Sequence, residues 1–246
     1  MRARVTARAT TGVTTRRAAA ALLTLLAATS CTPEPDPAPA SGGHGAPGAA
    51  LTAVDELTVK GRAPKTGYDR DRFGTPWADT DSNGCGTRDD ILKRDLADAR
   101  TKDGCKVTSG TLAPDPYSGL DITFRRGHSK VDVDHVVALS DAWQKGAGQW
   151  PAAKRIAFAN DPMNLVAAGA SANRSKGDGD TATWLPPAKP YRCTYVAAQV
   201  AVKKKYGLWV TSAERDAMRR VLNRCPDQRL PTGEAPTKAP PRFRAD

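Results

Sequence analysis

The stretch from residue 131 to residue 180 constrains the fold more than any other part of the chain. Residues 131–137 alternate apolar and polar side chains, which is typical of a half-buried strand. A polar excursion then leads to a short apolar strand, 164–168, and to a helix-like segment, 171–176, that stops at Gly177. We therefore expect two strands followed by one short helix at the centre of the structure.

Two segments ahead of this centre also have clear patterns. Residues 120–124 alternate apolar with polar side chains and predict another strand, introduced by an Asp-Pro-Tyr-Ser-Gly turn at 115–119. Residues 87–100 carry apolar side chains at helical spacing and predict one helix. Together with the centre, these elements indicate the α+β class.

The C-terminal part of the domain predicts a pair of helices. Residues 195–206 form a helical pattern with three lysines at its end, where positive charge is favourable against the helix dipole. Thr211 and Glu214 have the spacing of a capping box and open a second helix that runs to about Asn223. The short connection between the two predicts a helical hairpin.

The five cysteines divide into one and four. Cys31 falls beside the export signal described below, which leaves an even set in the folded part, as in proteins of oxidising compartments. Four cysteines allow three pairings. We predict Cys85–Cys105, which encloses the first helix, and Cys193–Cys225, which lies at one end of the helical hairpin.

Residues 1–30 have the order of a secretory signal peptide. Five arginines and no acid precede an apolar run at 18–28, which is too short to span a membrane. Residues 28–31 resemble a bacterial lipobox, so Cys31 is a candidate for lipidation, and ordinary cleavage with free release is the alternative. A linker rich in Pro, Gly and Ala extends through 31–54.

These patterns set the expected domain boundaries. An enzyme-like domain covers 55–226, with its core at about 115–190, and a polar, Pro-rich tail covers 227–246. The net charge is +11, and removal of residues 1–30 leaves +6. A basic balance favours polyanionic partners without deciding among them. We expect an extracellular protein, secreted or lipid-anchored at the surface, without a transmembrane helix in its mature form.

The chemistry is concentrated in Asp134, His135, Asn164 and Asn173. Hydrolysis of a phosphodiester needs a base that works near neutral pH, and histidine suits that role. It also needs positive charge at the phosphate, which Mg²⁺ supplies when one carboxylate and one amide oxygen hold it. Neighbours in a regular strand point to opposite faces, so Asp134 and His135 share a site only where the strand bulges, twists strongly or ends.

These residues resemble the motif of the HNH, or ββα-metal, endonucleases. The matching positions are Asp134-His135, Asn164, and Asn173 in Asn-Arg-x-Lys-Gly, with Asn in place of the family's third His. The longer text, from VDHVVALSDAW to NLVAAGASANRSKGDGDTATWLPP, resembles exported HNH proteins related to the C-terminal domain of GmrSD restriction enzymes. The resemblance implies a ββα-metal (His-Me finger) core with added helices and disulfides.

The resemblance also implies roles. His135 would be the general base, Asp134 and Asn173 would bind Mg²⁺ (or Mn²⁺), and Asn164 would orient the histidine or its loop. Four basic side chains are candidate contacts to the phosphates of a DNA or RNA substrate: Arg174, Lys176, Arg125 and Arg126. Each residue alone has a plainer reading, such as a core histidine, a turn cap or a solvated helix face.

Three functions fit this pattern. The first is a metal-dependent endonuclease that acts outside the membrane. The second is a non-catalytic surface module that binds nucleic acid on an HNH scaffold. The third is a hydrolase of another phosphodiester or of an envelope polymer, which shares the chemistry and differs in substrate.

Overall fold

The computed structural model of the chain describes residues 49–128 and 130–245. The predicted signal peptide, the candidate lipidation residue Cys31 and most of the 31–54 linker lie outside the described residues. Within the described part, no helix has the length and hydrophobicity needed to cross a membrane. The elements described below all belong to the unit formed by residues 41–246.

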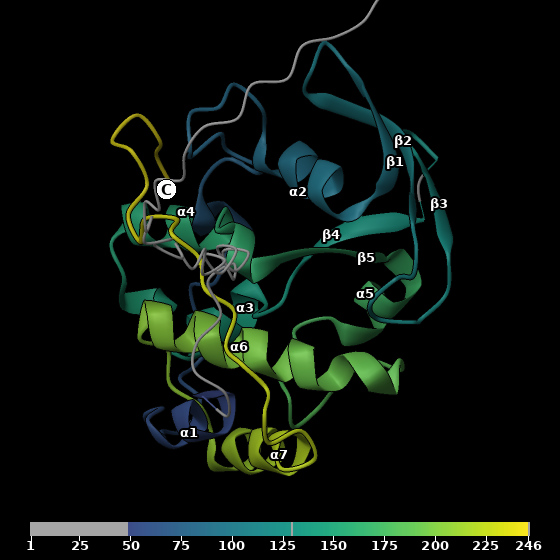
Figure 1. Ribbon diagram of the computed structural model, residues 1–246. Coiled ribbons are helices and arrows are strands. Elements are labelled where there is room, and N and C mark those ends of the chain that lie inside the picture. Colours follow the sequence, from purple (N-terminus) through teal and green to yellow (C-terminus); the bar gives the residue numbers. More distant parts are fainter. Residues whose placement is uncertain (1–48, 129, 246) are drawn as a thin grey trace, which may run out of the picture. The chain divides into compact units, whose positions relative to one another are not determined.

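The centre predicted from the sequence is present as two strands and a helix. Strand β4 (Val131–His135) pairs antiparallel with β5 (Leu165–Gly169), and α5 (Ala170–Lys176) follows β5 directly (Figure 1). Val131 and Val133 are buried, as the alternating pattern predicts. Gly177 ends α5 with a φ of 55°, a conformation that glycine adopts without steric cost.

Short helices fill the connection between β4 and β5. They are α3 (Leu139–Gln144), η2 (Ala147–Gln149), α4 (Ala152–Ala159) and η3 (Pro162–Asn164). Phe158 of α4 is fully buried in a cluster with Val137 and Leu139. The excursion between the two strands is therefore a packed layer that holds the backbone just after His135.

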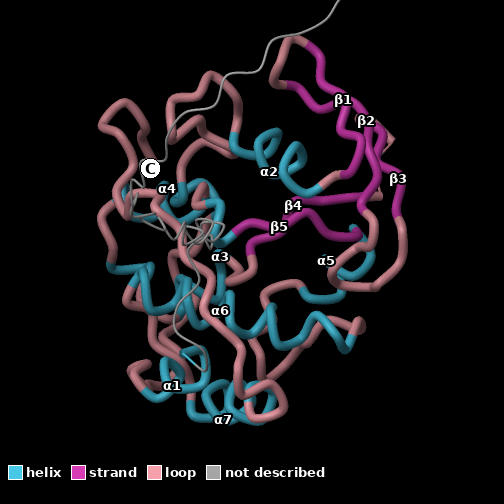
Figure 2. Tube along the Cα trace, viewed as in Figure 1, coloured by secondary structure: helices cyan, strands magenta, loops and turns pink. Residues whose placement is uncertain are grey.

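A three-stranded sheet lies beside this centre. Its order is β1 (Ala97–Lys102), β2 (Lys106–Leu112) and β3 (Ile122–Arg125), with α2 (Thr87–Asp95) ahead of it (Figure 2). The prediction of one helix through residue 100 is wrong, because the helix ends at Asp95 and a strand begins at Ala97. The Asp95 carboxylate accepts a hydrogen bond from the Ala167 N–H, which ties the end of the helix to β5.

The predicted helical hairpin is present as α6 (Arg192–Tyr206) and α7 (Ser212–Leu222). Two short 3₁₀ helices, η1 (Arg70–Phe73) and η4 (Lys189–Tyr191), precede α2 and α6 in the chain. The Thr211 hydroxyl accepts from the Glu214 N–H at 3.1 Å, as a capping residue does. Helix α1 (Ala49–Asp55) packs on both helices and buries Ala50, Ala53 and Val54. The folded part therefore begins before residue 55.

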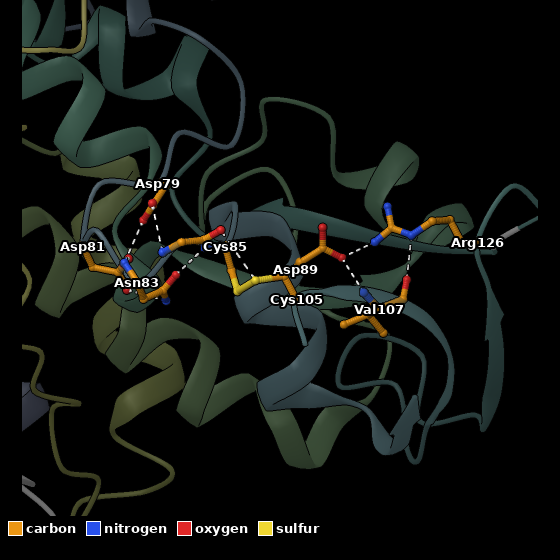
Figure 3. The surroundings of a disulfide bond; sticks show 9 residues. Asp79, Asp81, Asn83, Cys85, Asp89, Cys105, Val107 and Arg126 are labelled. Carbon is orange, nitrogen blue, oxygen red and sulfur yellow. Dashed lines mark hydrogen bonds and ion pairs between the residues drawn. A yellow bond between two sulfur atoms is a disulfide. The ribbon is translucent and has the colours of Figure 1, made fainter. Parts of the chain in front are cut away.

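Both predicted disulfides are present. Cys85–Cys105 spans 20 positions and joins the segment before α2 to the turn between β1 and β2, and Cys193–Cys225 spans 32 positions and ties the start of α6 to the chain after α7. Figure 3 shows the first bridge beside the loop of Asp79, Asp81 and Asn83. Cross-links of this loop length contribute about 3–4 kcal/mol in the chain-entropy model.

The segment predicted as a polar tail packs against the domain. Ala239 is buried, and its N–H donates to the Ala153 carbonyl of α4. Phe243 packs against the cluster of Ile156, Ala157 and Ala239, and the Arg242 guanidinium donates to the Asp79 carbonyl. Residues up to at least Phe243 therefore contribute to the fold.

A network of buried charges connects the helices around the centre. The Lys145 ammonium contacts Asp141, Asp180 and Glu214 at 2.6–2.8 Å, and the side chains of Lys145 and Glu214 are fully buried. Lys203 pairs with Asp141 and Glu214, and Arg62 pairs with Asp141 and Asp180. Burial alone would raise the pKa of Asp180, but Lys145 and Arg62 lower it to about 2. The network holds three cations against three carboxylates.

Candidate active site

Three of the four predicted chemical residues line one pocket. Asp134 and His135 at the end of β4 and Asn173 of α5 border a hollow of about 330 Å³. Its remaining wall includes Lys65, Tyr68, Arg70, Ser140, Gly177 and Asp178. The pocket therefore brings Asp134 and His135 of β4 together with Asn173 of the helix that follows β5.

The adjacent residues Asp134 and His135 reach the same pocket because the strand ends there. In the ladder, Asp134 is opposite Val166 and His135 is opposite Leu165, the last pair. The carboxylate turns toward Tyr117 and Lys176, and the imidazole turns toward Ala159. The two side chains thus approach the pocket from different sides.

The His135 imidazole is held as a neutral base. Its Nε2 lies 2.9 Å from the Ala159 carbonyl oxygen, which only accepts hydrogen bonds, so Nε2 carries the proton and Nδ1 keeps its lone pair. The Trp77 ring stacks on the imidazole, with 5.9 Å between the ring centroids and 13° between the ring planes. Burial lowers the pKa of His135 to about 3, and the positive charges of Arg70 and Lys176 act in the same direction.

This depressed pKa makes stability depend on pH. The imidazole takes up a proton near pH 6.5 in the unfolded chain but only near pH 3 in the folded chain, so its contribution is complete above pH 6.5 and is lost as the pH falls toward 3. Urea unfolding of the metal-free protein should show a loss of ~2 kcal/mol between about pH 7 and about pH 5 beyond the loss in a His135→Gln variant. Equal pH dependence in the two proteins would contradict a neutral, buried imidazole.

The Asp134 carboxylate already has two strong partners. The Tyr117 hydroxyl donates to Oδ2 at 2.6 Å, and the buried Lys176 ammonium lies 2.9 Å from Oδ2 and 3.1 Å from Oδ1. Burial and the charge of Asp134 raise the pKa of Tyr117 well above its usual value, so the hydroxyl stays a donor. These contacts fix the carboxylate at the wall of the pocket.

The Asn173 amide is oriented by a carboxylate that the sequence analysis did not single out. Its Nδ2 donates to Asp132 at 3.2 Å. Because the amide nitrogen is used in this bond, the oxygen is the atom left to meet a partner in the pocket. Asp132 therefore sets which end of the amide can serve as a ligand.

The donor set suits a lightly held, hydrated cation. Asp134 Oδ1 has one close partner where Oδ2 has two, and Asn173 offers an amide oxygen at the same pocket. Among residues 49–128 and 130–245, no group of three or more His, Cys, Asp or Glu side chains is placed to hold a metal. Mg²⁺ keeps several waters and needs few protein oxygens, so these two ligands match it better than they match a fully caged ion.

Asn164 lies behind the pocket and acts on the backbone. It is fully buried, its Oδ1 accepts from the Val137 N–H at 2.9 Å, and its Nδ2 donates to the carbonyls of Val137 and Phe158. Phe158 precedes Ala159, whose carbonyl holds His135. Of the two roles that the sequence suggests for Asn164, this geometry matches orientation of the loop.

The four candidate phosphate contacts fall into two groups. Lys176 and Arg126 are committed to the fold, since Lys176 pairs with Asp134 and donates to the His135 carbonyl, and Arg126 pairs with Asp89 (Figure 3). The Lys176 side chain is fully buried and the Arg126 side chain is 28% exposed, so a phosphate contact from either stays a prediction. Arg125 and Arg174 are exposed and line a separate hollow on the other face of α5.

Several pocket residues come from parts of the chain without a recognisable pattern. Arg70 and Lys65 bring positive charge to the pocket from the segment before Trp77. The Lys65 ammonium and the Ser140 hydroxyl hold the pKa of Asp178 below its usual value. Near Tyr117 the sequence shows only the turn at 115–119. Tyr68 and Trp77 have the pattern of ordinary packing residues.

Comparison with known families places the chain in one of them. A family model described as "GmrSD restriction endonucleases, C-terminal domain" matches residues 86–221. The chain belongs to this family. The matched range includes β4, β5 and α5, and it ends within α7.

A relative of this GmrSD C-terminal domain protein is known from a fungus. A protein of Arthroderma benhamiae described as an uncharacterized secreted protein is 38% identical over 205 residues, which cover 82% of this chain and 98% of the relative. No solved structure matches the chain.

Proposed function

We propose that this GmrSD C-terminal domain protein is an extracellular, metal-dependent endonuclease that hydrolyses phosphodiester bonds of DNA or RNA. The observation that carries the proposal is that Asp134, His135 and Asn173 border one pocket. The family's description as restriction endonucleases supports a nucleic-acid substrate. The two disulfides and the secreted fungal relative support an extracellular location, and lipidation of Cys31 stays a prediction.

In this proposal β4, β5 and α5 form the ββα-metal core. Nδ1 of His135 takes a proton from the attacking water, while the Nε2–H bond to Ala159 holds the ring in place. A phosphate anion in the pocket would favour the imidazolium and raise the low pKa of His135 toward the working range. Burial thus keeps the imidazole unprotonated, so that Nδ1 can accept the proton from water.

The other side chains position the site and supply charge. Tyr117 and Lys176 hold the Asp134 carboxylate, and Asp132 holds the Asn173 amide. Arg70 and Lys65 at the pocket can neutralise the nonbridging phosphate oxygens. A divalent cation held by Asp134 and Asn173 would supply the charge that stabilises the phosphate and the leaving oxygen.

The proposal predicts cleavage that depends on a divalent cation. The full chain should nick supercoiled plasmid with Mg²⁺ or Mn²⁺, lose this activity with excess EDTA, and regain it when Mg²⁺ is restored. Gel electrophoresis of plasmid over a metal series measures the effect. Nicking that persists in EDTA would remove the metal from the proposal.

One contact favours a second candidate function, a non-catalytic nucleic-acid-binding module. The Lys176 ammonium touches both oxygens of Asp134 and supplies a positive charge where a metal would bind. In that case the plasmid would be bound in a salt-dependent way and stay uncut with every metal tested. The same assay, run beside a binding measurement, separates the two functions.

A further inference from the structure

A second hollow borders α5 on a different face from the pocket. Asn173 and Gly177 line the pocket, whereas Ser171, Arg174 and Ser175 line a groove of about 980 Å³. With 3.6 residues per turn, Ser171, Arg174 and Ser175 lie roughly 100–160° around the helix axis from Asn173, so the two hollows border different faces of the helix. We call the second hollow the α5 groove, and its basic residues are Arg125, His128, Lys130 and Arg174.

The basic side chains of the α5 groove are exposed and have no carboxylate partner among the described residues. Arg125, Lys130 and Arg174 are exposed, and none of them forms an ion pair with another described residue. One of the two carboxylates at the groove, Asp115, is fully buried and accepts hydrogen bonds from the backbone N–H groups of Tyr117, Ser118 and Gly169. Only Asp121 remains as an exposed acid, so three permanent cations face solvent there.

The nearest basic residues in the sequence behave differently. Arg126, beside Arg125, is paired with Asp89, and Lys176, two positions after Arg174, is paired with Asp134. Each of these side chains serves the fold. Arg125 and Arg174, the members of these two neighbouring pairs without an ion pair among the described residues, both line the α5 groove.

We propose that the α5 groove binds the sugar-phosphate backbone of the substrate strand, several nucleotides away from the phosphate in the pocket. The inference rests on the proposed function and adds a second place where the chain would hold its polymeric substrate. Arginine and lysine side chains without protein partners release counterions when they meet phosphates, which gives affinity without reading bases. The groove is larger than the pocket, as several backbone units require.

The position of α5 sets the spacing. A strand with its scissile phosphate in the pocket must cross the helix, whose diameter with side chains is about 10–12 Å. Phosphates of one strand in duplex DNA advance about 3.4 Å per nucleotide along the axis. The groove phosphates are therefore about three nucleotides from the cleaved bond, beyond the reach of a dinucleotide.

The test compares two charge reversals of equal size. The Arg125→Glu/Arg174→Glu variant changes the groove, and the Arg220→Glu/Arg224→Glu variant changes two exposed arginines at and after the end of α7. Affinity of the full chain for a fluorescent DNA duplex is measured by anisotropy over a salt series in EDTA, where binding is read without cleavage. The slope of log affinity against log salt should fall by about 1.8 in the groove variant and stay unchanged in the control.

The outcomes separate the groove from the reaction. Wild-type hydrolysis of a small chromogenic phosphodiester with Mg²⁺ tests the pocket by itself. If that hydrolysis fails while only the groove variant loses salt dependence, the groove stands and the nuclease proposal falls. Equal slopes in both variants, or no binding of the duplex by the wild type, would overturn the groove whatever the small substrate does.

Discussion

Replacement of His135 by alanine should reduce plasmid cleavage by about 10²–10⁴-fold, the contribution of a positioned general base. The variant removes the imidazole that borders the pocket and leaves Asp134, Asn173 and the α5 groove in place. Initial nicking rates at saturating Mg²⁺ measure the loss. DNA affinity in EDTA should change little, because the backbone contacts lie elsewhere.

A matched control separates chemistry from folding. His44 lies in the predicted linker, so His44→Ala should cleave like the wild type. Removal of the buried His135 ring also takes away its stack on Trp77, so circular dichroism must show that the variant is folded. A folded His135→Ala protein that cleaves at the wild-type rate would exclude His135 as the base.

The second large effect is expected at the buried charge network. Glu214→Gln keeps the shape of the side chain but leaves the buried ammonium groups of Lys145 and Lys203 with one carboxylate fewer. Loss of one partner from a buried pair costs about 3–5 kcal/mol, because the remaining charge stays desolvated. The free energy of unfolding from urea titration should fall by about that amount.

The surface pair Lys204–Glu56 is the matched control. Its side chains are 50% and 52% exposed, and water already solvates both charges. Glu56→Gln should therefore change stability by about 1 kcal/mol or less. If Glu214→Gln were equally mild, the contacts between α7, Lys145 and Lys203 would not exist in solution.

Local patterns in the sequence predicted the elements that carry the site. The alternation at 131–137, the apolar segment before Asn173 and the glycine after Lys176 predicted β4, β5 and α5 within a residue or two. The cysteine pairs were predictable for the same reason, since each bridge joins the ends of a local unit. Short-range periodicity is enough for features of this kind.

Long-range contacts were the part that the sequence could not show. Tyr117 and Lys176 meet at Asp134 from positions 17 and 42 residues away, and no local pattern encodes such a meeting. From the sequence Lys176 is a candidate phosphate contact, because its position in the chain does not reveal that it pairs with the Asp134 carboxylate. Strand β1 was missed because it is mostly exposed, so its side chains lack the alternation that marks a half-buried strand.

The imidazole is covered by a residue from outside the range that the family match defines. Trp77 adopts a φ of 60°, rare for a bulky side chain, and in this strained conformation its ring lies flat on His135. A recombinant fragment trimmed to residues 86–221 would retain Asp134, His135 and Asn173 yet lose Trp77 and Arg70, which lie beside the imidazole. Fragments for activity tests should therefore start no later than Ala49 and continue past Phe243, because a shorter fragment lacks part of the surroundings of His135.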